Sequence, residues 1–405
     1  MKKIVGAAAI AALASGFAFA EASFNVNYRT SFDLINHKMG SNTNLFVTPS
    51  AMQATNDALS FKGKADFGGL ELEIDPAVGA DSAHSIALVK YNGWINFGDF
   101  MFKSGTWDSR AVGRVNKDIG NHAGKFWGEP LKPGLAHKLG TDGLGVDMSQ
   151  QSNKKMTYML QYANKDMGLE ARGAFTEKAS ATDYAEKTIA TDKDDWSFNN
   201  ETWFAEVGYK IPDFGRILVN AKTAHKNQAF GAFIEPSILD NLTSLVGFTF
   251  ERNYDNKSED DLTAYAMAVD VRVRYAINDQ LAVTGMFNWT GGDKVADATK
   301  ATTTKTAEYA SWASLHVRYA LNDTFVPFFS TIYSAGKTPG NVTEMQMDSK
   351  YSASLRFFPG VEIYNTKSAN IITGVVWDVA GFVEGQGINE CEKTFSIPVF
   401  MRVKF

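Results

Sequence analysis

Regular alternation of apolar and polar residues runs through most of this chain. The first such segment has apolar residues at Phe24, Val26, Tyr28, Phe32 and Leu34. Successive side chains in a strand point to opposite sides, so a period of two predicts a β-strand with one apolar face. The pattern therefore predicts strands from Phe24 onward.

The same pattern recurs often enough to predict an all-β protein. It is clearest around Val271, Val273 and Tyr275, which alternate with charged residues. Many segments reach about 9 to 12 residues, which suits a tilted strand that crosses a bilayer. We predict about eighteen strands, within a range of roughly 16 to 20. The predicted segments are 23–35, 57–67, 69–76, 84–95, 99–105, 155–163, 168–176, 201–210, 215–224, 229–235, 243–251, 262–275, 280–290, 307–320, 324–335, 349–358, 369–382 and 394–405.

Connections between these segments fall into two kinds. Very short turns are predicted at 68–69, 96–99, 164–167, 212–214, 278–279 and 322–323. Long polar loops are predicted at 36–56, 107–141, 177–200, 252–261, 291–306, 336–348 and 383–393. Short turns at one end and long loops at the other are typical of outer-membrane barrels, whose periplasmic turns are short. We therefore predict a transmembrane antiparallel up-and-down β-barrel over residues 21–405, with both termini on the periplasmic side.

Composition and charge exclude several other classes of protein. The chain has 405 residues, of which 44% are hydrophobic and 21% charged, and a single cysteine, Cys391. No apolar run of about 18 residues follows the first 20, so spanning helices are not expected. One cysteine excludes an intramolecular disulfide. The formal net charge of −5 argues against nucleic acid as a partner.

Residues 1–20 have the features of a secretory signal peptide. Lys2 and Lys3 form a basic start, an apolar stretch follows, and Ala18 and Ala20 form a small-x-small end. We predict cleavage before Glu21 and export across the inner membrane to the bacterial cell outer membrane.

The last predicted strand continues to the end of the sequence. Its apolar face consists of Phe395, Ile397, Val399, Met401, Val403 and Phe405. An apolar strand left unpaired at an edge invites aggregation, so we expect this strand to pair within a closed barrel. It resembles the terminal strand of bacterial outer-membrane barrels, in which a closing aromatic residue is part of the assembly signal. The resemblance implies that Met401, Val403 and Phe405 are recognised by the barrel-assembly machinery.

The layout of the chain also resembles that of the general bacterial porins. Residues 96–105 lead from a short turn into the longest loop, the third, at about 107–141. Residues 143–148 are similar to the return strand that follows this loop in the family. The resemblance implies a homotrimeric, water-filled pore for small hydrophilic solutes, embedded in outer-membrane lipid and lipopolysaccharide. It also implies a third loop that folds into the lumen.

The third loop is rich in cations. Its basic residues include Arg110, Arg114, Lys117, Lys125 and Lys132. If the loop folds inward, these side chains face permeating solutes where low-dielectric walls focus the field. Alternatively, they belong to a solvated surface loop.

The strands supply a second set of charges on the face predicted to be inward. In the carboxyl-terminal half these are Arg272, Arg274, His316, Arg318, Arg356, Arg402 and Lys404, and in the amino-terminal half Glu71, Glu73 and Asp75. Opposite signs on facing walls create a transverse field, and the basic excess predicts weak anion preference at neutral pH. Alternatively, these residues pair with one another as they line the lumen.

Signals for catalysis are weak. The six histidines lack the spacing of metal ligands, so neither a metal nor a cofactor is expected. Ser314 and His316 share a strand face, but a serine nucleophile also needs an orienting group and an oxyanion site. We predict a passive diffusion channel that is not an enzyme. The alternatives are a substrate-selective channel, a non-channel barrel that serves as an adhesin or surface antigen, and, less favoured, a barrel enzyme.

Overall fold

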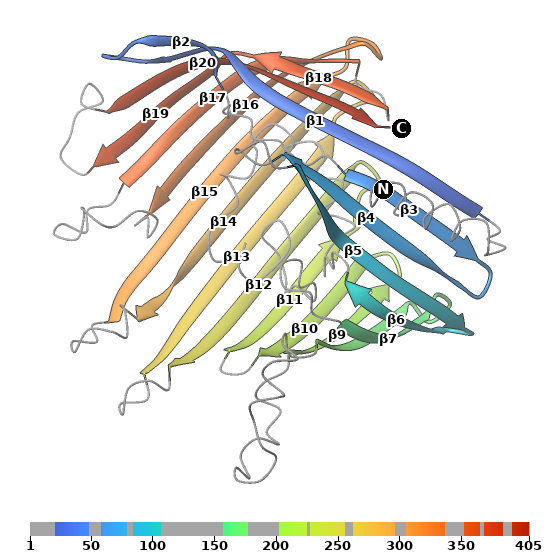
Figure 1. Cartoon of the computed structure of the whole chain (residues 1–405). Coiled ribbons are helices and arrows are strands. Elements are labelled where there is room, and N and C mark those ends of the chain that lie inside the picture. Colours follow the sequence, from blue (N-terminus) through green and yellow to red (C-terminus); the bar gives the residue numbers. More distant parts are fainter. Residues whose placement is uncertain are drawn as a thin grey trace.

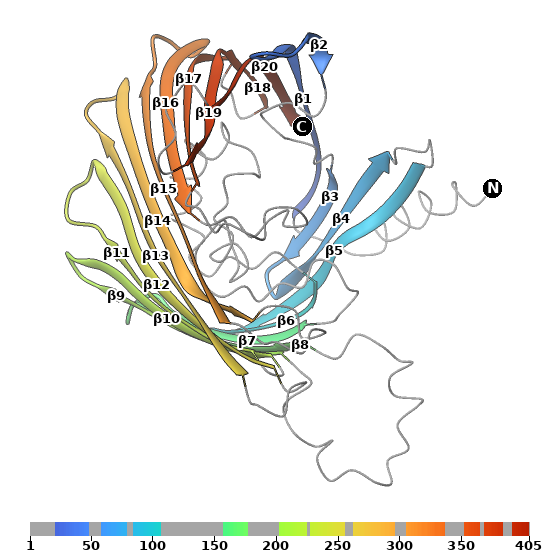
Figure 2. The same cartoon turned by 90° about the vertical axis from the view of Figure 1, so that its left-hand side faces the viewer.

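The described part of the chain forms one closed antiparallel sheet. The structure, a computed structural model, describes residues 21–47, 58–78, 84–106, 157–176, 202–224, 227–255, 262–295, 305–336, 352–364, 368–383 and 391–404. Each strand pairs with its neighbours in the sheet, and β1 pairs with β20, so the sheet closes into a barrel. Figures 1 and 2 show the strands tilted around the barrel from two directions.

The segments follow one another with turns and loops between them. They are β1 (Glu21–Lys38), β2 (Thr43–Val47), β3 (Ala58–Ala65), β4 (Gly68–Val78), β5 (His84–Phe97), β6 (Phe100–Thr106), β7 (Thr157–Asn164), β8 (Leu169–Thr176), β9 (Thr202–Ile211), β10 (Gly215–Ala224), β11 (Asn227–Pro236), β12 (Leu242–Asp255), β13 (Leu262–Ala276), β14 (Leu281–Val295), β15 (Lys305–Tyr319), β16 (Phe325–Gly336), β17 (Ser352–Ile363), β18 (Ala369–Gly374), β19 (Val376–Val383) and β20 (Glu392–Lys404).

These twenty described segments make an eighteen-stranded wall. β2 and β3 both pair with β1, one near its end and the other near its beginning, so they share one position in the wall. β18 and β19 both lie between β17 and β20 and form one strand that is interrupted at Val375. The predicted all-β antiparallel barrel and its strand number are therefore confirmed.

Two sequence predictions near the amino-terminal end are wrong. Residues 36–56 are predicted as a loop, but β1 runs to Lys38 and β2 follows after a turn in which Gly40 has a φ of +83°. The turn predicted at 68–69 lies instead at Asp66 and Phe67, and both glycines belong to β4. Gly69 is required there because a Cβ would lie 2.4 Å from the indole of Trp94 on β5.

The connections sort by length as the sequence predicts. Apart from the turn between β1 and β2, the described turns, such as 98–99, 212–214 and 277–280, lie at one end of the barrel, which we call the short-turn end. Connections at the opposite end, the long-loop end, are mostly longer, and the longest spans residues 107–156. The beginning of β1 and the end of β20 both lie at the short-turn end, beside the turns that follow β3 and β17. Residues 1–20, the third loop and residues 142–150 lie outside the described residues.

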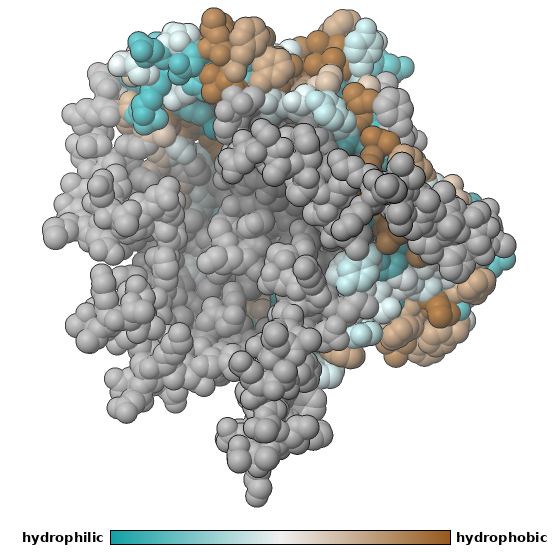
Figure 3. All heavy atoms as spheres, viewed as in Figure 1, coloured by the Kyte–Doolittle hydropathy of each residue, from teal (hydrophilic) through white to brown (hydrophobic). Residues whose placement is uncertain are grey.

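The barrel has an apolar outer surface. Exposed residues at alternate positions include Val207, Val219, Phe230, Phe248, Phe287, Leu315 and Phe329. Tyr209, Tyr275 and Tyr319 are exposed near the short-turn ends of their strands, which is typical of an aromatic girdle at a lipid interface. Figure 3 shows apolar residues gathered at the upper edge of the molecule, in the region of β1, β18 and β20. No helix among the described residues is long and apolar enough to cross a bilayer.

Candidate functional site

The candidate site is the inner wall of the barrel, by which we mean the side chains that alternate with the exposed apolar ones. Cross-strand partners point to the same side of a sheet, so register carries this assignment from strand to strand. Arg272, for example, lies opposite Leu245 on β12 and Met286 on β14, and all three are buried. In a closed barrel the face opposite the exposed one points inward. The inner wall can therefore be followed around the whole sheet.

The inner wall repeats one polar arrangement in three places. In each, one carboxylate accepts hydrogen bonds from both an arginine and an asparagine. The three sets are Arg172, Glu206 and Asn220; Arg272, Asp270 and Asn288; and Arg318, Glu362 and Asn370. We call these the Arg–carboxylate–Asn sets.

The second set is the most buried of the three. Arg272 Nε donates to Asp270 Oδ1 at 2.9 Å, Arg272 Nη2 donates to Asp270 Oδ2 at 3.2 Å, and Asn288 Nδ2 donates to the same Oδ2 at 3.1 Å. The side chains of Arg272 and Asp270 are only 4% and 3% exposed. Both oxygens of the buried carboxylate are thus satisfied, as burial of a charge requires.

Three further ion pairs join different strands. Arg216 Nη2 lies 2.8 Å from Glu170 Oε2, and Arg216 Nη1 lies 3.7 Å from Glu235 Oε2. Arg356 Nη2 donates to Asp378 Oδ2 at 2.7 Å. The charges of the inner wall are therefore extensively paired, within one strand, between adjacent strands or across an intervening strand.

The structure places the sequence-predicted wall residues as follows. Arg272, Arg274, Arg318 and Arg356 lie on the inner wall, and three of them pair with carboxylates. Glu71 and Glu73 lie on the inner wall of β4, and Asp75 belongs to β4 without a described side chain. Arg110, Arg114, Lys117, Lys125, Lys132 and Phe405 lie outside the described residues, whereas Met401 and Val403 lie in β20 and face outward.

The described residues contradict a division of the wall into one basic and one acidic side. Arg272, Arg318 and Arg356 each have an acidic partner on their own side of the barrel. On the opposite side, Lys62 lies directly opposite Glu71 in the strand register, so both signs of charge occur there too. Local pairing lowers the energy of close charges more than a distant field does, because Coulomb energy falls with separation. Of the two interpretations open from the sequence, mutual pairing is the one observed.

The amino-terminal part of the wall combines cations with an aromatic ring. The ammonium groups of Lys62 and Lys103 lie 5.6 and 5.9 Å from the centre of the Trp94 ring. These distances are those of cation–π contacts. Gly69 lies beneath the ring, so the indole packs closely against the wall.

An apolar group of residues on the inner wall was not expected from the sequence. Its members are Phe328, Ile332, Phe358, Ile372, Val376 and Phe400, which we call the inner apolar cluster. The rings of Phe328 and Phe358 meet edge to face, with centroids 5.0 Å apart. Three apolar pairs in the sequence, 328–329, 357–358 and 371–372, interrupt the alternation and mark strands that are apolar on both faces.

Gly360 makes room for the inner apolar cluster. A Cβ at this position would lie 2.3 Å from the Phe328 ring and 2.8 Å from the carbonyl oxygen of Thr373. We expect Gly360→Ala to lower the free energy of unfolding by about 1 to 3 kcal/mol, the usual cost of overpacking. Gly285→Ala is the matched control, because a Cβ at Gly285 meets no atom within 4 Å. Urea titration of the two variants measures the difference, and equal midpoints would contradict the packing role of Gly360.

His316 is buried on the inner wall beside a serine. Its Nδ1 forms a short hydrogen bond with Ser330 Oγ on β16, and its ring lies 5.6 Å from that of Phe328. The serine in contact is thus a cross-strand partner of His316 and differs from Ser314, the one singled out in the sequence. Among the described residues, no group of three or more His, Cys, Asp or Glu side chains is arranged to hold a metal ion.

Comparison with known proteins gives similarity in structure only. No family model matches the sequence, and no curated protein matches it. An anion-selective porin from Comamonas acidovorans has a TM-score of 0.52 at 11% identity, covering 95% of this chain and 99% of the porin. OccK3 (OpdO) from Pseudomonas aeruginosa has a TM-score of 0.51 at 10% identity, covering 96% of each chain. OccAB4 from Acinetobacter baumannii has a TM-score of 0.51 at 8% identity, covering 96% of this chain and 99% of that one.

These similarities define a class of fold. The chain is a closed β-barrel of the kind formed by bacterial outer-membrane porins. The resemblance to porins in layout is therefore confirmed at the level of the fold.

Proposed function

We propose that this protein is an outer-membrane channel through which small hydrophilic solutes and ions diffuse passively, without chemical change. The observation that carries the proposal is the distribution of side chains over a closed barrel. The outer surface is apolar, whereas charged and amide side chains recur on the inner wall. A barrel in lipid needs such an outer surface, and a polar interior is typical of porins.

We further propose a weak preference for anions. Inward cations in the described residues are Lys38, Lys62, Lys64, Lys103, Arg172, Lys210, Arg216, Lys222, Arg272, Arg274, Arg318, Arg356, Arg402 and Lys404. Inward carboxylates are Glu21, Asp33, Glu71, Glu73, Glu170, Glu206, Glu235, Asp270, Glu362, Asp378 and Glu392. The cations are slightly more numerous, and most charges are paired, so the expected preference is small.

The test is single-channel recording of the mature protein in a planar bilayer with a salt gradient. We expect stable current steps. We also expect a small reversal potential whose sign shows that anions pass more readily than cations. Inserted barrels that pass no current would contradict the channel and favour a surface adhesin or antigen. Current that a particular solute blocks at low concentration would favour a substrate-selective channel instead.

The partners follow from the same proposal. We propose that the protein forms a homotrimer in outer-membrane lipid and lipopolysaccharide. We also propose that the barrel-assembly machinery recognises its final strand. The outward apolar face of β20 supports the last point, because Met401 and Val403 are partly exposed on it. Crosslinking in the native membrane and size measurement in mild detergent test the oligomeric state.

A further inference from the structure

The outer surface of the barrel contains a hollow. It has a volume of about 640 Å³, within the range of roughly 300 to 1,000 Å³ that small-molecule sites occupy. Its lining is apolar except at one end, and it is formed by segments of β16 to β20 together with Met39 after β1. We call it the outer groove.

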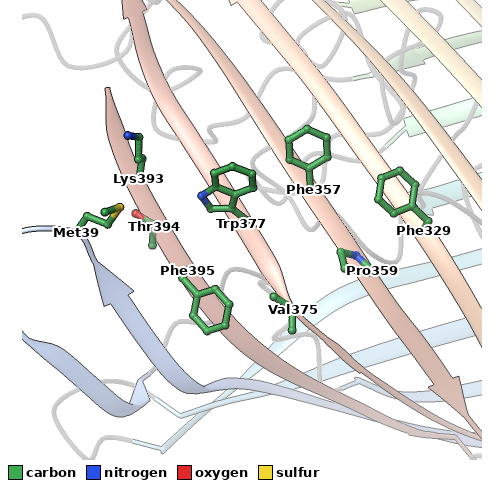
Figure 4. Close-up of a pocket in the computed structure, with 9 residues that line it drawn as sticks. All are labelled: Met39, Phe329, Phe357, Pro359, Val375, Trp377, Lys393, Thr394 and Phe395. Carbon is green, nitrogen blue, oxygen red and sulfur yellow. The ribbon is translucent and has the colours of Figure 1, made fainter. Parts of the chain in front are cut away.

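Aromatic rings form the outer groove. Phe357, Trp377 and Phe395 are direct cross-strand partners, and Phe329 lies beside them on β16. Ring centroids are 5.7 Å apart between Phe357 and Trp377 and 6.4 Å apart between Phe329 and Phe357. Figure 4 shows the row of rings across the outer side of the strands.

The interruption between β18 and β19 lies in the wall of the outer groove. At Val375 the regular ladder breaks, and the Val375 backbone N–H donates to the Pro359 carbonyl at 3.0 Å. Val375 and Pro359 line the outer groove beside the rings (Figure 4). Because small side chains alternate here with large rings, the surface is concave where neighbouring strands present a flat face.

One end of the outer groove carries a cation. Lys393 and Met39 lie at this end, and Phe329 lies at the other (Figure 4). The Met39 backbone N–H donates to the Lys393 carbonyl at 2.9 Å, next to the point where β20 begins at the long-loop end. The lysine therefore belongs to the region where a membrane-spanning strand meets the lipid headgroups.

We infer that the outer groove binds an acyl chain of an anionic membrane lipid, whose negatively charged headgroup pairs with Lys393. This inference rests on the proposed location in the outer membrane. A concave, almost entirely apolar surface suits a flexible hydrocarbon chain, which fills a hollow that a second rigid barrel would leave empty. An ammonium group at the headgroup level adds attraction for an anionic lipid.

Quenching of Trp377 by lipids with brominated acyl chains tests the inference. The mature protein is placed in vesicles of neutral lipid that contain brominated phosphatidylglycerol or, separately, brominated phosphatidylcholine. Trp377→Phe identifies the part of the signal that comes from Trp377, and Trp289→Phe is the control at another outward tryptophan. We expect a preference of about fivefold for phosphatidylglycerol at Trp377, the size expected of one lysine near an anionic headgroup.

Two variants separate the headgroup from the chain. Lys393→Gln should remove the preference, whereas Lys165→Gln, in an exposed turn, should leave it unchanged. Val375→Phe should fill the hollow and reduce quenching by both lipids. Equal quenching by the two lipids in the unmodified protein would overturn the inference, and so would a Trp377 that no lipid quenches because a second copy of the chain covers it. Single-channel current from the same samples reports separately on the channel, so the two proposals can fail independently.

Discussion

Replacing Arg272 with alanine is expected to lower the free energy of unfolding by about 3 to 5 kcal/mol. The reason is the buried carboxylate that remains. Asp270 would keep its hydrogen bond from Asn288 but would lose both bonds from the guanidinium, in a place where its side chain is 3% exposed. An isolated buried charge costs far more than the ion pair itself contributes.

Arg356→Ala provides the matched comparison. Its pair with Asp378 is similar in geometry, but the two side chains are 21% and 24% exposed, so water can solvate the remaining carboxylate. We expect a loss of about 1 kcal/mol for this variant. Urea titration followed by tryptophan fluorescence measures both, and Arg272→Ala combined with Asp270→Asn should recover part of the loss. If the two arginine variants lose the same free energy of unfolding, burial does not explain the destabilisation caused by Arg272→Ala.

Removing two wall carboxylates is expected to make the channel clearly anion-selective. Glu362→Gln and Asp378→Asn together leave Arg318 and Arg356 without their acidic partners while preserving side-chain shape. The Coulomb interaction between a unit charge and an ion about 4 Å away is about 1 kcal/mol even in water. The two unpaired arginines together should therefore raise the anion-to-cation permeability ratio about tenfold or more.

The reversal potential in a salt gradient measures this change. Arg318→Gln with Arg356→Gln should shift the potential in the opposite direction, since it leaves the two carboxylates unpaired. Asp279→Asn, in an exposed turn, is the control and should have little effect. A potential that does not change in either double variant would mean that ions do not pass along this part of the inner wall.

The strands could be predicted because the alternation that marks them depends only on residues close together in the sequence. A strand with one face in lipid must alternate, and every apolar position from Phe24 to Phe32 reports that requirement without reference to the rest of the chain. β2 was missed because five residues between a turn and a loop are too few to show a period. The turn at 68–69 was misplaced because Gly69 is needed under Trp94, which is distant in sequence.

The sequence predicts which charged side chains face inward, but it does not predict which residues they pair with. Alternation places Arg318 inward, yet its partner Glu362 lies 44 residues away on β17, and only the strand register brings the two together. The same holds for Arg172 and Glu206. Alternation does not reveal the inner apolar cluster, because two adjacent apolar residues, such as those at 371–372, do not show which of them faces the lumen.

The pairing of β1 with β20 has a consequence for how the protein is made. Asn27 lies opposite Lys404, and Arg402 Nε donates to Asn27 Oδ1 at 3.1 Å, so the seam joins residues 375 apart. Contacts so distant in sequence form slowly, and the edges of β1 and β20 remain open until the last strand has been synthesised. These open edges can pair with other copies of the chain, so we expect a lesion that delays β20 to cause aggregation before it causes any loss of conductance.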